Sequence, residues 1–214
     1  MSDADGFGPE DLLSAVPVPR ETAARLEKHR ALLAAWAPKI NLIGPQEPSQ
    51  YWRPPARDSL QLLLHAPGAM RWIDLGSGAG FPGLVLACGL IDQPGAEVVL
   101  IEPNPKRVAF LREAIRATGA PARVLAIKGE EFAPDERELP IITARALAPL
   151  ERIIHNHAAI FARGALGLFL KGSDAEQEIA QAKRHWDFTA SLEPSLSDPR
   201  GRIVRLEGVA PCPN

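Results

Sequence analysis

The segment Trp72-Ile-Asp-Leu-Gly-Ser-Gly-Ala-Gly-Phe-Pro-Gly83 indicates how the whole chain folds. It begins with a short apolar strand, expected over residues 70–75, that carries an acidic residue, Asp74, near its end. Glycines then occupy alternate positions, and Pro82 suits the first turn of a helix that we expect to end near Leu90. A strand, a glycine turn and a helix in this order form a cofactor-binding crevice at the carboxyl end of a parallel sheet. Because the turn lacks Cβ atoms, a ligand can approach its backbone closely.

The acidic residues around this turn indicate the kind of cofactor. Gly78-Ala-Gly80-Phe-Pro-Gly83 matches the G-x-G-x-x-G pattern of dinucleotide sites, but that pattern alone is weak, and a turn that binds no ligand is the plain alternative. Asp74 precedes the glycines, and its carboxylate suits an ammonium group better than a pyrophosphate. A second expected strand, Glu97–Ile101, is followed by Glu102, whose carboxylate can accept hydrogen bonds from both hydroxyls of a ribose. This combination resembles the S-adenosylmethionine site of class I methyltransferases.

Apolar segments alternate with helical patterns along the rest of the chain. Further strands are expected at residues 97–101, 122–128, 139–144 and 165–170. Helices are expected at residues 104–119, 149–161 and 175–185, and a final hairpin is expected from residues 186–192 and 201–206. Repeated strand–helix units predict an α/β fold with a mostly parallel sheet covered on both faces, to which the hairpin adds an antiparallel C-terminal edge strand.

The composition is typical of a cytoplasmic protein with one domain of ordinary size. The 214 residues carry a net charge of −2 and are expected to divide into a flexible N-terminus (1–19), a small helical N-terminal extension (20–68) and a Rossmann-like domain (69–214). No apolar run is long enough to cross a membrane, and the acidic N-terminus lacks a signal-peptide pattern. The two cysteines lie far apart, so neither a disulfide framework nor a metal site is expected.

The N-terminal extension has a basic character of its own. Residues 20–36 show the apolar spacing of a helix, and Asp58-Ser59 are expected to cap a helix over residues 60–65. Residues 20–57 contain seven Lys and Arg residues against three Glu residues. Such a face can meet phosphate groups, although a merely solvated helix face explains the charge equally well.

Polar residues at the expected strand ends are the candidates for chemistry. In a parallel sheet the active groups lie at the carboxyl ends of strands, and these ends hold Asp74, Glu102, Gly129-Glu130, Arg145 and Lys171. Arg145 and Lys171 each follow an apolar strand, and cations there suit an anion or the O6/N7 edge of guanine. For each of them, a salt bridge to a neighbouring carboxylate is the alternative. Glu130 either caps the following helix or lines an adenine pocket.

The histidines do not suggest a metal or a nucleophile site. His155 and His157 lie in an expected helix, where a spacing of two residues points them to different faces, and the sequence offers them no cluster of partner ligands. His29, His65 and His185 are isolated and are expected to be surface or packing residues.

Several short motifs lie between about Leu26 and Leu206. They are Trp36 followed by Asn41-Leu42, Asp58-Ser59, Asp74–Gly83, Lys106–Leu111, Ile142–Ala146 and Leu170–Gly172. Together they resemble the RsmG (GidB) family of small-subunit rRNA guanine-N7 methyltransferases. The glycine motif followed by Phe-Pro-Gly, together with Thr-Ala-Arg-Ala and Leu-Lys-Gly, is far more specific than the glycines alone.

This resemblance implies a class I S-adenosylmethionine-dependent methyltransferase that methylates N7 of a guanine in 16S rRNA of the small ribosomal subunit and releases S-adenosyl-L-homocysteine. The enzyme is expected to be a monomer without metal and without membrane contact. Lys171 is expected near the target base and, with Arg145, is the catalytic candidate. With the residues derived above, the expected cofactor site comprises Asp74, Gly76, Gly78, Gly80, Phe81, Glu102, Gly129, Glu130 and Arg145.

One departure from the family pattern concerns the RNA. The family usually has Arg-His in an R-H-x-x-D-S motif, whereas this chain has Pro54-Pro55 there, between Arg53 and Arg57. The prolines remove backbone donors and stiffen the loop, and an imidazole and a guanidinium are lost. Arg53 or Arg57 is the candidate substitute for contact with RNA.

The implied reaction needs no general base, because guanine N7 has a free lone pair and the sulfonium methyl group is already activated. Catalysis then consists of placing N7 in line with the methyl–sulfur bond, with Phe81 or Trp52 available to stack on the base. Three alternatives remain: a methyltransferase of this fold with another substrate, a ribosome-binding protein that keeps only the cofactor pocket, and a nucleotide-dependent dehydrogenase.

Overall fold

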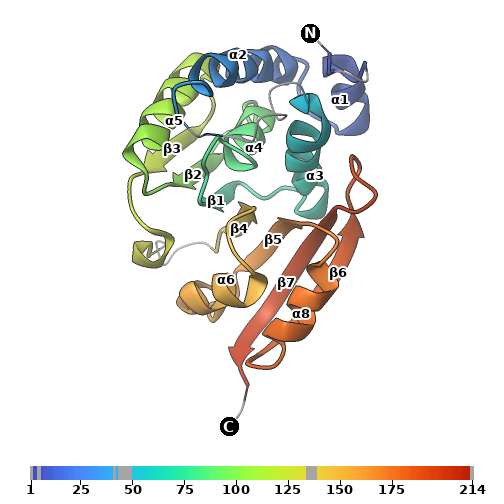
Figure 1. The fold of residues 1–214 in the computed structure, drawn as a ribbon, viewed down its shortest axis with the longest axis vertical. Helices are drawn as coiled ribbons and strands as arrows, with labels where there is room; N and C mark the ends of the chain where they lie inside the picture. Colours follow the sequence, from blue (N-terminus) through green and yellow to red (C-terminus); the bar gives the residue numbers. More distant parts are fainter. Residues whose placement is uncertain (1, 4–5, 41, 43–49, 134–138, 213–214) are drawn as a thin grey trace.

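The computed structural model describes residues 2–3, 6–40, 42, 50–133 and 139–212 (Figure 1). Its centre is a seven-stranded sheet in the order β3-β2-β1-β4-β5-β7-β6. The strands are β1 Arg71–Leu75, β2 Glu97–Ile101, β3 Ala122–Leu125, β4 Ile141–Arg145, β5 Leu166–Lys171, β6 Trp186–Pro194 and β7 Arg202–Pro211. β1 to β5 pair in parallel, and the β6–β7 hairpin joins β5 in antiparallel fashion. The mostly parallel sheet with an antiparallel C-terminal edge is therefore confirmed.

Helices cover both faces of this sheet. The N-terminal helices are α1 Pro9–Ala15, α2 Glu21–Trp36, the π-helix η2 Trp52–Ala56 and α3 Arg57–His65. The later ones are α4 Gly83–Gly89, α5 Pro105–Thr118, the 3-10 helix η3 Gly129–Glu131, α6 Leu150–Asn156, α7 Ala158–Phe161 and α8 Ala175–Ala182. Helix α2 contacts α4 and α5, and helix α3 contacts α4. The N-terminal segment therefore packs directly on the helices of one sheet face (Figure 1).

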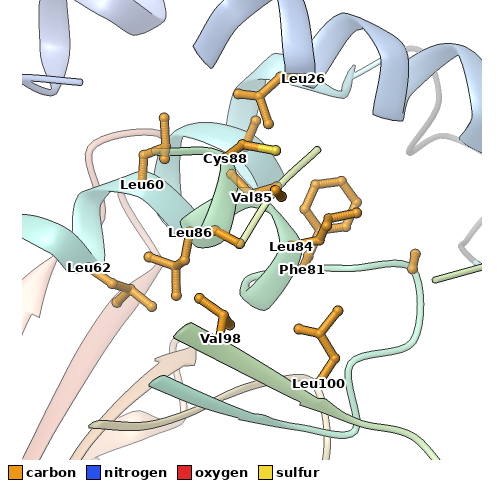
Figure 2. Close-up of a cluster of buried hydrophobic side chains, with 14 of the residues drawn as sticks. Leu26, Leu60, Leu62, Phe81, Leu84, Val85, Leu86, Cys88, Val98 and Leu100 are labelled. Carbon is orange, nitrogen blue, oxygen red and sulfur yellow. The ribbon is translucent and has the colours of Figure 1, made fainter. Parts of the chain in front are cut away.

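The core consists of two apolar layers, one on each side of the sheet. Successive side chains of a strand point to opposite faces, and β2 shows this clearly. Val98 and Leu100 pack with α2 to α5, where Figure 2 shows them beneath Leu86 and Phe81 of the α4 region. Val99 and Ile101 pack on the other face with residues of α6, α7 and α8.

Some local expectations are confirmed and others are wrong. Helix α5 begins where it was expected, and the side chain of Asn104 caps it by accepting from the N–H groups of Lys106 and Arg107. The expected cap Asp58-Ser59 is wrong. α3 already begins at Arg57, because η2 runs directly into it, and the Ser59 hydroxyl instead donates to the Pro55 carbonyl at 2.5 Å.

Other boundaries also differ from the sequence expectation. β3 ends at Leu125, before the expected residue 128. The helix expected over residues 149–161 is divided at His157 into α6 and α7. The expected flexible N-terminus contains α1, which buries Leu12 completely. Asn41 lies outside the described residues, and the division of the chain into domains stays a prediction.

Candidate active site

The glycine turn follows β1 directly, and its backbone conformation requires glycine at several positions. Gly76, Gly78 and Gly80 all have positive φ, at 67°, 52° and 90°, which is strained for residues with a side chain. Gly83, at the start of α4, is required for a different reason. A Cβ there would lie 2.4 Å from Leu100 and 2.6 Å from the Asp74 carboxylate. These glycines therefore let the turn and helix α4 approach strands β1 and β2 closely.

Asp74 is buried completely beneath the turn, and only one of its two carboxylate oxygens has a hydrogen-bond partner among the described residues. Its Oδ2 accepts from the Gly83 N–H at 3.1 Å, while its Oδ1 has no hydrogen-bond partner among the residues that the structure describes. Burial raises the pKa of Asp74 to about 7. A buried acceptor without a partner is costly. The ammonium group of S-adenosylmethionine has the charge and the donors that this oxygen lacks, so Asp74 fits the cofactor.

Glu102 joins the end of β2 to the glycine turn. The side chain is 2% exposed, and its two oxygens accept from the Gly78 N–H and the Asn104 N–H, each at 2.9 Å. The Arg107 guanidinium lies 3.9 Å away. A carboxylate can accept about four hydrogen bonds, so Glu102 retains capacity for ribose hydroxyls.

A cavity of about 470 Å³ opens beyond the ends of β1, β2 and β3, and we call it the Gly129 cavity. It is lined by Leu75, Gly76, Ile101, Pro103, Lys128, Gly129, Glu130, Leu147, Ala148, Arg152, Ile153, Asn156 and His157. Glu130 is exposed there and accepts from the Asn156 amide at 2.7 Å. Glu130 therefore lines a cavity, and whether this cavity takes the adenine, as one of the two expected roles of Glu130 requires, stays a prediction.

A second cavity of about 580 Å³, the Lys171 cavity, lies beyond the ends of β4 and β5. It is lined by Pro54, Pro55, Asp58, Arg145, Ala146, Leu147, Ala148, Pro149, Leu170, Lys171, Gly172, Ser173, Asp174, Glu178, Asp198, Arg200 and Gly201. Leu147 and Ala148 line both cavities, so the segment after β4 separates them. The two cavities therefore adjoin.

The two candidate catalytic cations are both held by protein groups. Lys171 Nζ donates to the Ala148 carbonyl at 2.6 Å and to Glu178 Oε2 at 2.7 Å, and its side chain is only 10% exposed. The salt bridge that the sequence left as an alternative is thus present for Lys171. Arg145 places its guanidinium 5.6 Å from the centre of the Phe81 ring, a cation–π distance. Their catalytic roles stay a prediction.

The contacts of two residues near the site were not expected from the sequence. His29, expected to be a surface or packing residue, is buried completely, and its ring nitrogens lie 2.8 Å from the Tyr51 hydroxyl and from the Ala79 carbonyl. Burial lowers the pKa of His29 to about 4. Asp58 accepts from the Ser195 hydroxyl at 2.8 Å, and burial raises its pKa. A lone histidine in a helix gives no sequence signal for such a contact.

Metal-binding clusters and membrane-spanning helices are both absent from the described ranges. No group of three or more His, Cys, Asp or Glu side chains there is placed to hold a metal ion. No helix in those ranges is long and apolar enough to span a bilayer.

Solved structures with the same arrangement of elements define the class of protein. An O-methyltransferase from Bacillus cereus in complex with S-adenosylhomocysteine is 19% identical, with a TM-score of 0.56 over 92% of this chain and 95% of its own. A mutant of MtNAS in complex with S-adenosylmethionine is 16% identical, with a TM-score of 0.56 over 88% of this chain and 72% of its own. These likenesses concern the fold, which is the Rossmann-like fold of S-adenosylmethionine-dependent methyltransferases, as expected.

Sequence comparison identifies the family. The model of the family GidB, rRNA small subunit methyltransferase G, matches residues 22–199. A protein named ribosomal RNA small subunit methyltransferase G from Rhodopseudomonas palustris (strain HaA2) is 46% identical over 92% of this chain and 84% of its own. The protein of the same name from Bradyrhizobium sp. (strain BTAi1) is 46% identical over 91% and 88%. The chain belongs to the rRNA small subunit methyltransferase G family and is an S-adenosylmethionine-dependent rRNA methyltransferase.

Proposed function

We propose that this enzyme methylates N7 of a guanine in 16S rRNA as part of the small ribosomal subunit. The observation that carries the proposal is the pair of adjoining cavities in a chain of this family. One cavity adjoins the glycine turn with its buried carboxylates, and the other holds two cations, Arg145 and Lys171. A guanine edge offers two acceptors, O6 and N7, that suit such cations.

Each candidate cofactor residue has a definite task in this proposal. Asp74 receives the ammonium group, Glu102 receives the ribose hydroxyls, and the backbone of Gly76, Gly78 and Gly80 lets the cofactor lie close to the turn. Gly129 and Glu130 line the space for adenine, and Arg145 lies against the Phe81 ring on the side of the Lys171 cavity. Phe81 is 5% exposed and Trp52 is completely buried, so neither of the two rings expected to stack on the base is presented to it. When bound, S-adenosylmethionine supplies a methyl group already activated by the sulfonium.

The chain's own work in the reaction is positioning. Guanine N7 carries a lone pair in the plane of the ring, so no proton has to be removed before attack and we propose no general base. Lys171 holds the O6 edge of the base or a neighbouring phosphate, and Arg145 holds the base from the side of Phe81. Orientation of this kind can account for a large part of a rate enhancement.

The two prolines that depart from the family motif, Pro54 and Pro55, lie at the Lys171 cavity, which we take as the substrate site. Pro54 and Pro55 line the Lys171 cavity, so this wall offers no backbone donors. Arg53 and Arg57 both lie against the Phe7 ring, at 5.3 and 5.2 Å from its centre, and Arg57 donates to the Leu196 carbonyl. Arg200 also lines the cavity. We propose that Arg53, Arg57 and Arg200 supply the phosphate contacts at this wall.

We further propose that the enzyme acts in the cytoplasm as a monomer. Sedimentation of the purified protein tests this, and a concentration-independent dimer would contradict it.

The direct test is transfer of tritiated methyl groups from S-adenosylmethionine to small ribosomal subunits from cells lacking this enzyme. Intact subunits and naked 16S rRNA are assayed in parallel, and the modified nucleoside is identified by mass spectrometry. A single N7-methylguanine is the expected product, and its yield from each substrate shows which RNA state is accepted. Cofactor binding without transfer to either substrate would favour a non-catalytic ribosome-binding protein, whereas transfer to another molecule would favour a different substrate.

A further inference from the structure

The ring nitrogen Nε2 of His157 is buried and has no task in the proposed methyl transfer. The residue lies between α6 and α7, is 5% exposed and lines the Gly129 cavity. Its Nδ1 lies 2.8 Å from the Ile153 carbonyl oxygen. Since a carbonyl only accepts, Nδ1 carries the hydrogen, and in the neutral ring Nε2 then presents a lone pair. This Nε2 has no hydrogen-bond partner among the described residues.

Gly129 packs directly beside this buried nitrogen. A Cβ at position 129 would lie 2.6 Å from His157 Nε2 and 3.2 Å from its Cε1. Any side chain there would cover the edge of the imidazole or displace it. The absence of a side chain at Gly129 therefore leaves room for the His157 imidazole at the wall of the cavity.

The cavity around His157 suits a flat ring with a donor on one edge. Leu75, Ile101, Pro103 and Leu147 give it apolar walls. An unpaired acceptor in such a place calls for a hydrogen-bond donor from the ligand. Adenine linked through N9 has ring nitrogens that only accept, and its 6-amino group is the sole donor on the hydrogen-bonding edge of the base.

We propose that His157 Nε2 accepts a hydrogen bond from the 6-amino group of the cofactor's adenine and that this contact selects a 6-amino purine over a 6-oxo purine. The inference rests on the proposed placement of adenine in the Gly129 cavity. His157 is thereby a binding and specificity residue, separate from the acidic groups that hold the ribose and the ammonium.

The test compares two ligands by isothermal calorimetry, S-adenosyl-L-homocysteine and S-inosyl-L-homocysteine, which carries an oxo group in place of the amine. The natural chain is expected to bind the inosine form about tenfold more weakly, because a carbonyl oxygen then faces the Nε2 lone pair. In His157→Leu, binding of the adenosine form falls by about tenfold and the preference between the two ligands disappears. In His157→Gln, whose side-chain oxygen can accept, most of the preference returns.

Two controls keep the outcomes separate. His155→Leu changes an exposed histidine of α6, two residues before His157, and is expected to leave both affinities unchanged. Nitrogen-15 NMR of the natural chain is expected to show the His157 Nε2 resonance shifting when S-adenosyl-L-homocysteine binds, a signature that a merely structural role would not produce. Equal binding of the two ligands by the natural chain, or an unchanged preference in His157→Leu, would overturn the proposal. Failure to bind S-adenosyl-L-homocysteine at all would instead refute the proposed cofactor site.

Discussion

The two adjoining cavities differ in how their polar groups are satisfied. On the cofactor side, Asp74 Oδ1 and His157 Nε2 are buried acceptors without a partner among the described residues. On the substrate side, Lys171 is held by Glu178 and a carbonyl, and Asp58 is held by Ser195. A buried acceptor without a partner costs free energy, so a ligand that donates a hydrogen bond to it is bound more tightly. With the ligands placed as we propose, the cofactor side offers these groups to one small molecule, whereas the substrate side exchanges existing contacts for new ones when RNA binds.

The largest expected effect tests whether Lys171 leaves its partners to serve the reaction. Lys171→Ala should lower kcat by about a hundredfold, as loss of one positioned donor typically does, with the Kd of S-adenosylmethionine unchanged. Methyl transfer to small subunits and calorimetry measure the two quantities. Lys183→Ala, at an exposed lysine just after α8, is the control and should keep full activity. Full activity of Lys171→Ala would show that this lysine is only structural.

The next effect tests the unpaired oxygen of Asp74. Asp74→Asn keeps the shape of the side chain but removes its charge, so S-adenosylmethionine should bind about tenfold to a hundredfold more weakly. Calorimetry with the same chain before and after the change gives the ratio. Asp92→Asn, at an exposed position, should bind normally. If the Asp74 variant also bound normally, the ammonium group would have to lie elsewhere.

A smaller effect concerns the dependence of stability on pH. Burial lowers the pKa of His29 from 6.5 to about 4, so the unfolded chain binds this proton more readily and the free energy of unfolding decreases as the pH falls through that window. Burial raises the pKa of Asp74 from 3.8 to about 7, so the folded chain holds this proton more strongly and the free energy of unfolding decreases as the pH rises through that window. The two trends oppose each other between about pH 4 and about pH 6.5, where both windows overlap.

Asp74→Asn removes one of these trends. The variant should therefore lose stability more steeply than the natural chain on acidification from about pH 6.5 to about pH 4.5, by at most about 1.4 kcal/mol per pH unit. Urea denaturation at several pH values measures the slopes. Parallel curves for the two chains would show that Asp74 has an ordinary pKa in the folded state.

The smallest expected effect concerns the wall of the substrate cavity. The Ser195 hydroxyl donates to Asp58 and accepts from the N–H groups of Ser197 and Asp198 at 3.0 Å each, which ties the β6–β7 turn to α3. Ser195→Ala should cost about 1 kcal/mol of stability and raise the KM for RNA a few-fold with kcat unchanged. Ser191→Ala on exposed β6 should change neither. A large loss of kcat instead would place Ser195 closer to the reacting atoms than this comparison suggests.

Local patterns determined most of the fold and the outline of the cofactor site. The apolar run before Gly76, the Asn104-Pro105 helix start and the Gly119 helix end were correct because each depends on a few neighbouring residues. Gly119 ends α5 with φ 64°, which a glycine adopts readily. The Asp58-Ser59 cap failed because these side chains are engaged by Ser195 and Pro55, contacts that no local pattern contains.

The order of strands and helices, the glycine turn between Asp74 and Gly83, and the acids and cations at strand ends could all be predicted from the chain, because they follow from periodicity and from the geometry of parallel sheets. Three contacts could be known only after folding: the burial of His29 against Ala79, the pairing of Lys171 with Glu178, and the packing of the His157 ring beside Gly129. These contacts join distant segments. Their formation depends on how the helices pack on the sheet, and packing of this kind leaves no periodic trace in the chain.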